Sequence, residues 1–188
     1  MNIGRRYWPA SLNNLPESTH KRVSLDYLKE FESNFKQGWG LWLWGQNSTG
    51  KTYTACSILK ELNRLGYSTY CILADVLKVA YIDGERFDTD MSIIQRVESV
   101  DILLIEDLGK EYSGKGSGWA ELNFENMIRK RSRELLPCIV TTNLTPAEFK
   151  ERYKQSAAAI AMESMTPIEV KGDDLRRVAA ASKIKGYK

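Results

Sequence analysis

Residues 41–52 read Leu41-Trp42-Leu43-Trp44-Gly45-Gln46-Asn47-Ser48-Thr49-Gly50-Lys51-Thr52, an apolar run followed by the pattern G-x-x-x-x-G-K-T. This pattern is typical of a P-loop, in which a buried strand leads through a glycine-containing loop into a helix. The two glycines let backbone N–H groups approach phosphate oxygens closely. Because the preceding run is apolar and the following residues have helical spacing, we interpret residues 45–52 as a phosphate-binding loop rather than an ordinary glycine turn.

The polar residues of this loop are suited to bind a nucleotide. Lys51 is placed to reach the β- and γ-phosphates, and Thr52 offers its hydroxyl to Mg²⁺. The helix that begins here directs the positive end of its dipole at the same phosphates. We therefore predict that ATP or ADP, with Mg²⁺, is bound by the whole loop, namely Gly45, Gln46, Asn47, Ser48, Thr49, Gly50, Lys51 and Thr52.

An acidic pair follows a near-continuous apolar segment. Residues 100–105 predict a central strand buried on both faces, and this run ends in Glu106 and Asp107 at the carboxyl tip of the strand. Ligands of open α/β sheets bind at the carboxyl ends of the strands, so both carboxylates are expected beside the metal and the γ-phosphate. We interpret them as a Walker B pair in which Glu106 joins Thr52 as a metal ligand. Solvated acids at a strand end are the alternative.

An amide side chain follows the strand predicted for residues 138–142. Asn143 stands at the end of this strand, and Thr145 with Pro146 predicts the start of the next helix. An amide at this position is suited to orient the water that attacks the γ-phosphate. Because asparagine is also common in turns, a turn-forming role is the alternative for Asn143.

The remaining sequence alternates short apolar strands with helical segments. Further strands are predicted over 67–74 and 168–170, and helices over 53–65, 75–80, 91–97, 119–134 and from Asp174 onward. Residues 110–118 indicate a loop, and the helix after it is expected to pack through Leu122, Met127 and Ile128. Such alternation is typical of an α/β protein of three layers, in which helices flank a central, mostly parallel sheet of five strands.

Composition limits the class of protein. The 188 residues, 43% of them hydrophobic, are enough for one core, and the formal net charge is +3. Cys56, Cys71 and Cys138 stand among apolar residues without metal-site spacing, which predicts buried, reduced thiols. No segment has the length of a membrane span or the core of a signal peptide, so we expect a cytoplasmic protein without a membrane partner.

These motifs together resemble one family. Gly45 to Thr52 match its Walker A motif, Ile105 to Gly109 its Walker B motif, and Val140 to Thr145 its sensor 1. The segment Tyr7 to Leu12 adds to the likeness, and in residues 172–176 Arg176 matches the sensor 2 arginine that reaches the nucleotide. Over most of its length the chain is similar to the AAA+ ATPases of the bacterial and phage helicase-loader type, which are DnaC-like and close to the IstB-type transposition ATPases.

The resemblance implies an AAA+ core over residues 39–188 and an N-terminal extension, residues 1–38, that packs on it. It also implies an ATPase that binds single-stranded DNA and loads or remodels a replicative hexameric helicase within an ATP-dependent oligomer. Basic residues at both ends of the chain agree with a nucleic-acid partner, although charge alone favours solvated termini. The residues expected to contact DNA, each alternatively a solvated surface charge, are Lys78, Arg86, Lys110 and Lys115.

Three features depart from the family's pattern. Its members usually carry Asp-Asp or Asp-Glu, and the order Glu106-Asp107 predicts slow hydrolysis because the shorter Asp107 positions the attacking water poorly. Residues 156–165 hold no arginine where the family's trans-acting finger is found. About forty residues precede the P-loop strand, which we expect to be too few for a separate helicase-binding domain. Other arginines could replace the finger but are expected to be exposed helix charges, namely Arg129, Arg131, Arg133 and Arg152.

Other functions share part of this pattern. An IstB-like ATPase that remodels DNA for a transposase carries the same motifs. A P-loop kinase of nucleotides or other small molecules is also a single α/β domain of this size, but the Thr-Thr-Asn strand end argues against it. An ATP-dependent DNA-binding adaptor that scarcely hydrolyses ATP is a third alternative, which the swapped carboxylates and the missing finger favour.

Overall fold

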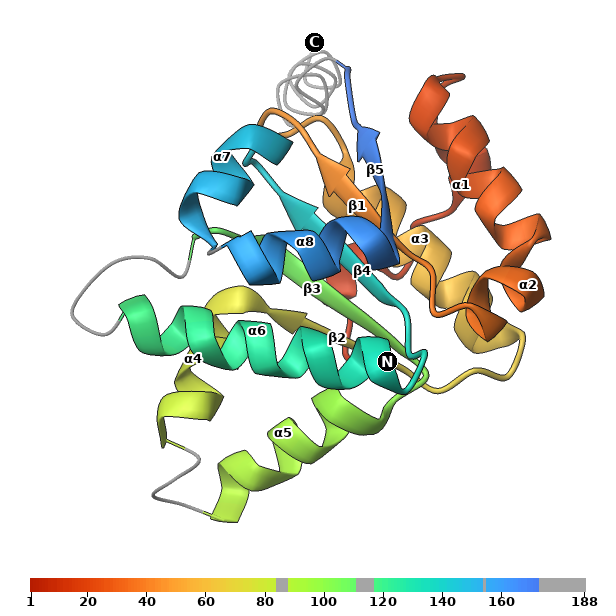
Figure 1. Ribbon diagram of the computed structural model, residues 1–188. Coiled ribbons are helices and arrows are strands. Elements are labelled where there is room, and N and C mark those ends of the chain that lie inside the picture. The colour runs from red at the N-terminus through yellow and green to blue at the C-terminus, as the bar shows by residue number, and fades with distance from the viewer. Residues whose placement is uncertain (84–87, 111–116, 154, 173–188) are drawn as a thin grey trace, which may run out of the picture.

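The computed structural model describes residues 1–83, 88–110, 117–153 and 155–172 (Figure 1). The strands are β1 (Gly40–Trp44), β2 (Thr69–Leu73), β3 (Ile102–Leu108), β4 (Cys138–Thr142) and β5 (Met165–Glu169). The helices are α1 (Thr19–Lys29), α2 (Phe31–Lys36), α3 (Lys51–Arg64), α4 (Ala74–Asp83), α5 (Asp88–Ser99), α6 (Ser117–Arg133), α7 (Pro146–Arg152) and α8 (Gln155–Ser164). Two 3₁₀ helices, η1 (Arg5–Tyr7) and η2 (Leu12–Asn14), precede them.

The five strands form one parallel sheet in the order β2-β3-β4-β1-β5. Strand β1 lies between β4 and β5, with Leu41 opposite Ile139 on one side and Thr166 on the other. Because all strands run in one direction, the carboxyl ends of β1, β3 and β4 meet at the same end of the sheet. The predicted α/β class with a five-stranded parallel sheet is confirmed.

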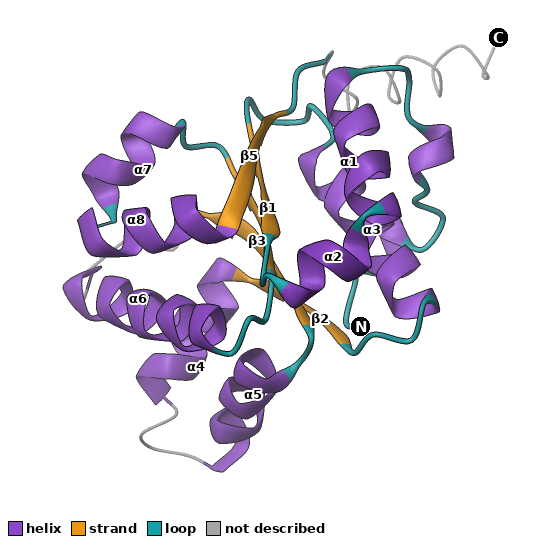
Figure 2. Cartoon of the chain, turned by 45° about the vertical axis from the view of Figure 1, so that its right-hand side comes forward, coloured by secondary structure: helices purple, strands orange, loops and turns teal. Residues whose placement is uncertain are grey.

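Helices cover both faces of the sheet, with α1, α2 and α3 on one side and α4 to α8 on the other (Figure 2). Successive residues of β1 enter the two cores in turn. Trp42 packs on Phe149 of α7 with ring centroids 4.4 Å apart, whereas Leu41 and Leu43 join the core that α3 covers. Strands covered in this way are apolar on both faces, which explains their near-continuous hydrophobic sequences. Within the described ranges, no helix is long and apolar enough to span a membrane.

The third strand begins and ends later than the apolar run of residues 100–105, and the acidic pair lies near its tip as predicted. Strand β3 continues through Glu106 and Asp107 to Leu108. Glu106 still pairs with Leu73 of β2, so the partner strand holds the backbone extended beyond the apolar run. The pairing with β4 shifts between Ile105 and Leu108, so Asp107 lies in an irregular part of the ladder.

Two other predictions from apolar spacing are corrected. Leu122 is 49% exposed, whereas Met127 and Ile128 are buried, so α6 packs through these two residues together with Phe124. Strand β5 begins at Met165, earlier than the predicted 168–170, because its whole length pairs with β1. The helix predicted from residue 174 lies outside the described residues.

Arg131 is not the exposed charge that was predicted, because its side chain is fully buried. The guanidinium donates hydrogen bonds to four backbone carbonyl groups that lie 2.8–3.2 Å away, those of Val97, Val100, Asp101 and Pro137. Its Nε also donates to the Cys138 sulfur. Arg131 thus joins the end of α5 and the residues that lead into β3 to Pro137, which leads into β4. By contrast, Arg129 is exposed and donates 2.7 Å hydrogen bonds to Glu125 and Ser156.

Residues 1–38 pack on the α3 side of the sheet. Tyr27 of α1 and Phe31 of α2 are buried in the same core cluster as α3. At the start of the chain, the backbone N–H of Cys71 donates to the Met1 carbonyl at 3.0 Å, and the Asn2 side chain donates to the Cys71 carbonyl at 3.0 Å. These contacts agree with an extension that packs on the core, and the boundary at residue 38 stays a prediction.

Candidate nucleotide-binding site

The loop between β1 and α3 has the backbone geometry of a tight cradle. Gly45 has a φ of +144°, and a Cβ there would lie 2.6 Å from the carbonyl oxygen of Val170. Gly50 precedes α3 in the left-handed conformation, with a φ of 101°. Both positions require glycine, because a larger residue is strained at each φ and would collide at position 45. The loop backbone therefore closes tightly around the amino end of α3.

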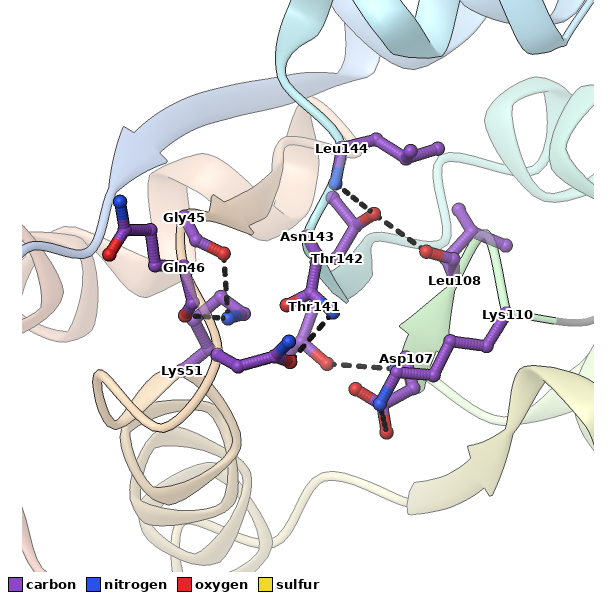
Figure 3. Close-up of polar contacts among 11 residues, drawn as sticks. Gly45, Gln46, Lys51, Asp107, Leu108, Lys110, Thr141, Thr142, Asn143 and Leu144 are labelled. Carbon is purple, nitrogen blue, oxygen red and sulfur yellow. Dashed lines mark hydrogen bonds and ion pairs between the residues drawn. The ribbon is translucent and has the colours of Figure 1, made fainter. Parts of the chain in front are cut away.

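Lys51 lies inside this cradle (Figure 3). Its side chain is buried, and Nζ donates to the carbonyl oxygens of Gly45 at 2.8 Å and Gln46 at 2.6 Å. The ammonium group is thereby held over the loop that was predicted to bind phosphates. Phosphate oxygens are negatively charged, so they would add ion-pair attraction to the hydrogen bonds that this ammonium group can donate.

Glu106 is a buried carboxylate beside Thr52. Its Oε1 accepts a 2.9 Å hydrogen bond from the Cys71 thiol, and the Thr52 hydroxyl hydrogen-bonds the same carboxylate. Burial raises the pKa of Glu106, and the nearby Asp107 adds to this rise, whereas the bonds from Cys71 and Thr52 oppose it. The described ranges hold no cluster of three or more His, Cys, Asp or Glu side chains for a metal. Mg²⁺ bound to phosphates needs only one or two protein oxygens, so Thr52 and Glu106 fit this ion.

Asp107 is half exposed and has an uncommon backbone conformation, with a φ of 57°. Its backbone N–H donates to the Thr141 hydroxyl at 3.1 Å, which joins β3 to β4. Its carboxylate forms a 2.7 Å ion pair with Lys110. Lys110, which was predicted to contact DNA, is therefore paired with the residue that was predicted to activate water.

Asn143 lies at the tip of β4 and faces the P-loop. Its Nδ2 donates to the Asn47 side chain at 2.9 Å, whereas its own Oδ1 is buried and has no hydrogen-bond partner among the described residues. Thr142 fixes this tip by donating to the Leu108 carbonyl at 2.6 Å. A buried acceptor without a donor is rare in proteins, so Asn143 Oδ1 is suited to accept a hydrogen bond from water or a ligand.

These side chains surround one cavity of about 540 Å³, a typical volume for a small-molecule site. Among the predicted residues, those that line it are Asn47, Ser48, Gly50, Lys51, Thr52, Glu106, Asp107, Lys110 and Asn143. Thr49 instead turns into the loop, where its hydroxyl donates to the Gln46 carbonyl at 3.0 Å. Gln46 itself is exposed, and Gly45 forms the start of the cradle.

Sequence reasoning missed four residues that line the same cavity, namely Arg6, Tyr7, Tyr53 and Leu73. The segment that begins with Tyr7 carried part of the family resemblance, but no spacing placed it beside the P-loop. A hydrogen bond of 3.3 Å from the Ser11 N–H to the Tyr53 hydroxyl holds this segment against α3. The N-terminal residues are therefore part of the cavity wall.

The other predicted site residues lie away from the cavity or cannot be placed. Lys78 is half-buried on α4 and lines a separate apolar pocket with Leu77, Leu108 and Phe124. Arg86, Lys115 and Arg176 lie outside the described residues. The structure therefore brings together the P-loop, the acidic pair and Asn143, and of the residues predicted to contact DNA it places only Lys110 in the same cavity.

Comparison with known proteins is informative for both sequence and fold. No family model matches the chain. One curated relative is the replicative helicase loader DnaI of Bacillus subtilis (strain 168), which is 24% identical over 132 residues. The match covers 70% of this chain and 41% of DnaI, so the chain spans less than half the length of that relative.

The solved structures decide the fold. A crystal structure of the DnaC helicase loader superimposes with a TM-score of 0.74 at 23% identity, covering 89% of this chain and 100% of that one. The chain has the fold of the DnaC helicase loader. The replication initiator DnaA bound to AMPPCP and single-stranded DNA also has this fold, with a TM-score of 0.72, 18% identity, and coverage of 92% of this chain and 52% of DnaA. The similarity to DnaI in sequence and to DnaC in fold confirms the resemblance to helicase loaders found in the sequence.

Proposed function

We propose that the protein binds ATP with Mg²⁺, hydrolyses it slowly, and uses the nucleotide state to control its binding to single-stranded DNA and to a replicative helicase. The observation that carries this proposal is the meeting in one cavity of Lys51, Thr52, the acidic pair and Asn143, whose buried Oδ1 has no partner in the described part of the chain. The similarity to DnaI supports a helicase as the partner, and the DnaA fold supports nucleotide and DNA as ligands.

Each residue of the cavity has a separate role in this reaction. The loop N–H groups and Lys51 bind the phosphates, and Thr52 and Glu106 hold Mg²⁺, which would neutralise phosphate charge. Asn143 Oδ1 accepts a hydrogen bond from the attacking water, and Asp107 accepts the proton of that water. Because the Asp107 carboxylate is already bonded to Lys110, it is less free to bond the attacking water, in agreement with slow hydrolysis.

The experiment that tests this function is DNA binding with and without nucleotide. We expect labelled single-stranded DNA to bind the wild-type protein in the presence of ATP and Mg²⁺, as measured by fluorescence anisotropy. The Lys51→Ala protein is expected to lose the ATP-dependent part of this binding, because the lysine contacts the phosphates directly. Absence of DNA binding by the wild-type protein would contradict the proposal and favour a small-molecule kinase.

The partner can be tested in the same way. A replicative hexameric helicase should form an ATP-dependent complex with the wild-type protein and not with Lys51→Ala, as measured by size-exclusion chromatography. Binding to a transposase in place of the helicase would support the IstB-like alternative.

The ion pair between Lys110 and Asp107 leads to a prediction about the rate. We expect Lys110→Ala to raise ATP hydrolysis without DNA about two- to fivefold, because an exposed pair of this kind is worth up to about 1 kcal/mol. Phosphate release measures the rate. Lys36→Ala is the control, since Lys36 forms a comparable exposed pair with Glu32 far from the cavity. An unchanged or lower rate for Lys110→Ala would show that the pair does not restrain Asp107.

A further inference from the structure

Cys71 occupies an unusual position behind the acidic pair. It lies in the edge strand β2, its side chain is buried, and its thiol donates to Glu106 Oε1 at 2.9 Å. The thiol of Cys56, on α3, lies 3.9 Å from the same oxygen. Both cysteines are free thiols, so each retains an S–H group that can donate a hydrogen bond.

The backbone of Cys71 is fixed on both sides. On one side Cys71 pairs with Leu104 of β3. On the other side its N–H and carbonyl groups are bonded to Met1 and Asn2 at the start of the chain. The sulfur therefore has a defined position relative to the carboxylate two residues further along β3.

We propose that Cys71 is a positioning residue for the metal-binding carboxylate of Glu106. The thiol holds Oε1, so that the remaining lone pairs of the carboxylate are directed to Thr52 and to the ion between them. Glutamate has one more rotatable bond than aspartate, and an acid of this length in β3 needs a second contact to fix its orientation. This inference rests on the proposed function, because it assumes that the cavity binds a nucleotide with Mg²⁺.

The chemistry of the contact sets the size of the effect. A thiol is a weak donor, so its hydrogen bond contributes less than one from a hydroxyl or an N–H group. Loss of the contact frees the carboxylate to rotate but leaves its charge and its ligand atoms in place. We expect a several-fold loss of Mg²⁺ affinity for the nucleotide complex rather than its abolition.

The test compares Cys71→Ala and Cys71→Val, which lack the donor, with Cys71→Ser, which retains one. A fluorescent ATP analogue is titrated into each protein in EDTA and then at increasing Mg²⁺ concentrations. For the alanine and valine proteins we expect the half-saturating Mg²⁺ concentration to rise about three- to tenfold, which corresponds to about 0.7–1.4 kcal/mol, while affinity in EDTA is unchanged. Cys71→Ser is expected to recover most of the wild-type Mg²⁺ dependence.

Several results would overturn the inference. These are an unchanged Mg²⁺ requirement in the alanine or valine protein, an equal loss of affinity in EDTA, and a serine protein no better than alanine. Cys138→Ala is the matched control, and we expect it to change the Mg²⁺ requirement less than twofold because this buried free thiol of β4 lies against Arg131. A wild-type protein that fails to bind the analogue would refute the proposed function, whereas Mg²⁺-dependent binding that Cys71→Ala leaves unchanged would refute only the role of Cys71.

Discussion

The Lys51→Ala protein is expected to bind ATP about 100-fold more weakly than the wild-type protein. Lys51 Nζ is buried in the loop and donates hydrogen bonds of 2.8 Å and 2.6 Å to two loop carbonyls. The loop therefore places a positive charge where the phosphates would lie. Hydrogen bonds that involve a charged group contribute about 1.5–3 kcal/mol each, and 1.4 kcal/mol corresponds to a factor of ten. Titration with a fluorescent ATP analogue measures the affinity, and phosphate release should fall at least as far.

Arg64→Ala is the control for this experiment. Arg64 ends the same helix α3 and forms an exposed ion pair with Glu61, away from the loop. We expect its substitution to leave ATP affinity within twofold of wild type. A Lys51→Ala protein that binds ATP within threefold of wild type would show that the loop does not hold the phosphates.

Arg131→Ala is expected to lower the free energy of unfolding by about 3–5 kcal/mol. Its guanidinium satisfies four carbonyl groups through two buried and two part-buried bonds, and a buried polar group left without a partner costs about 1–3 kcal/mol. Removal of a buried charge offsets part of this loss, which keeps the expected change within that range. Urea unfolding followed by circular dichroism measures the difference.

Two variants show whether the hydrogen bonds of Arg131 are responsible. Arg131→Lys retains the charge with fewer donors and a different geometry, so we expect an intermediate loss of stability. Arg133→Ala removes an exposed arginine from the same helix, and such surface changes are usually within about 0.5 kcal/mol. Equal stability of Arg131→Ala and Arg133→Ala would contradict the assigned role.

Local motifs explain why much of the fold and the cavity could be predicted from the sequence. The P-loop residues are contiguous, and Asn143 directly follows an apolar strand, so a few residues define each feature. Thr145 also forms the predicted helix start, in which its hydroxyl accepts a 3.2 Å bond from the Glu148 N–H and its own N–H donates a 2.7 Å bond to the Glu148 carboxylate. The bond from the Thr145 N–H is the main cause that lowers the pKa of Glu148, and the bond from the Thr145 hydroxyl adds to it. All these features depend on neighbours in the sequence.

The predictions that failed depend on distant residues. The length of β3 is set by its pairing with β2, which extends the strand through a buried acid that hydrophobicity alone would exclude. The burial of Arg131 depends on carbonyl groups at the end of α5 and in the connections before β3 and β4, and these have no signature in residue type. The contribution of Tyr7 to the cavity likewise depends on the path of the N-terminal segment across α3.

The place of β1 in the sheet has a consequence for synthesis on the ribosome. Strand β1 emerges early, yet its neighbours β4 and β5 begin only at Cys138 and Met165. At translation rates of about 5–20 residues per second, the strand waits roughly 5–20 s for its first neighbour. During this interval the apolar residues Leu41 to Trp44 lack their native partners, so the nascent chain is most prone to aggregation or chaperone capture before β4 is made.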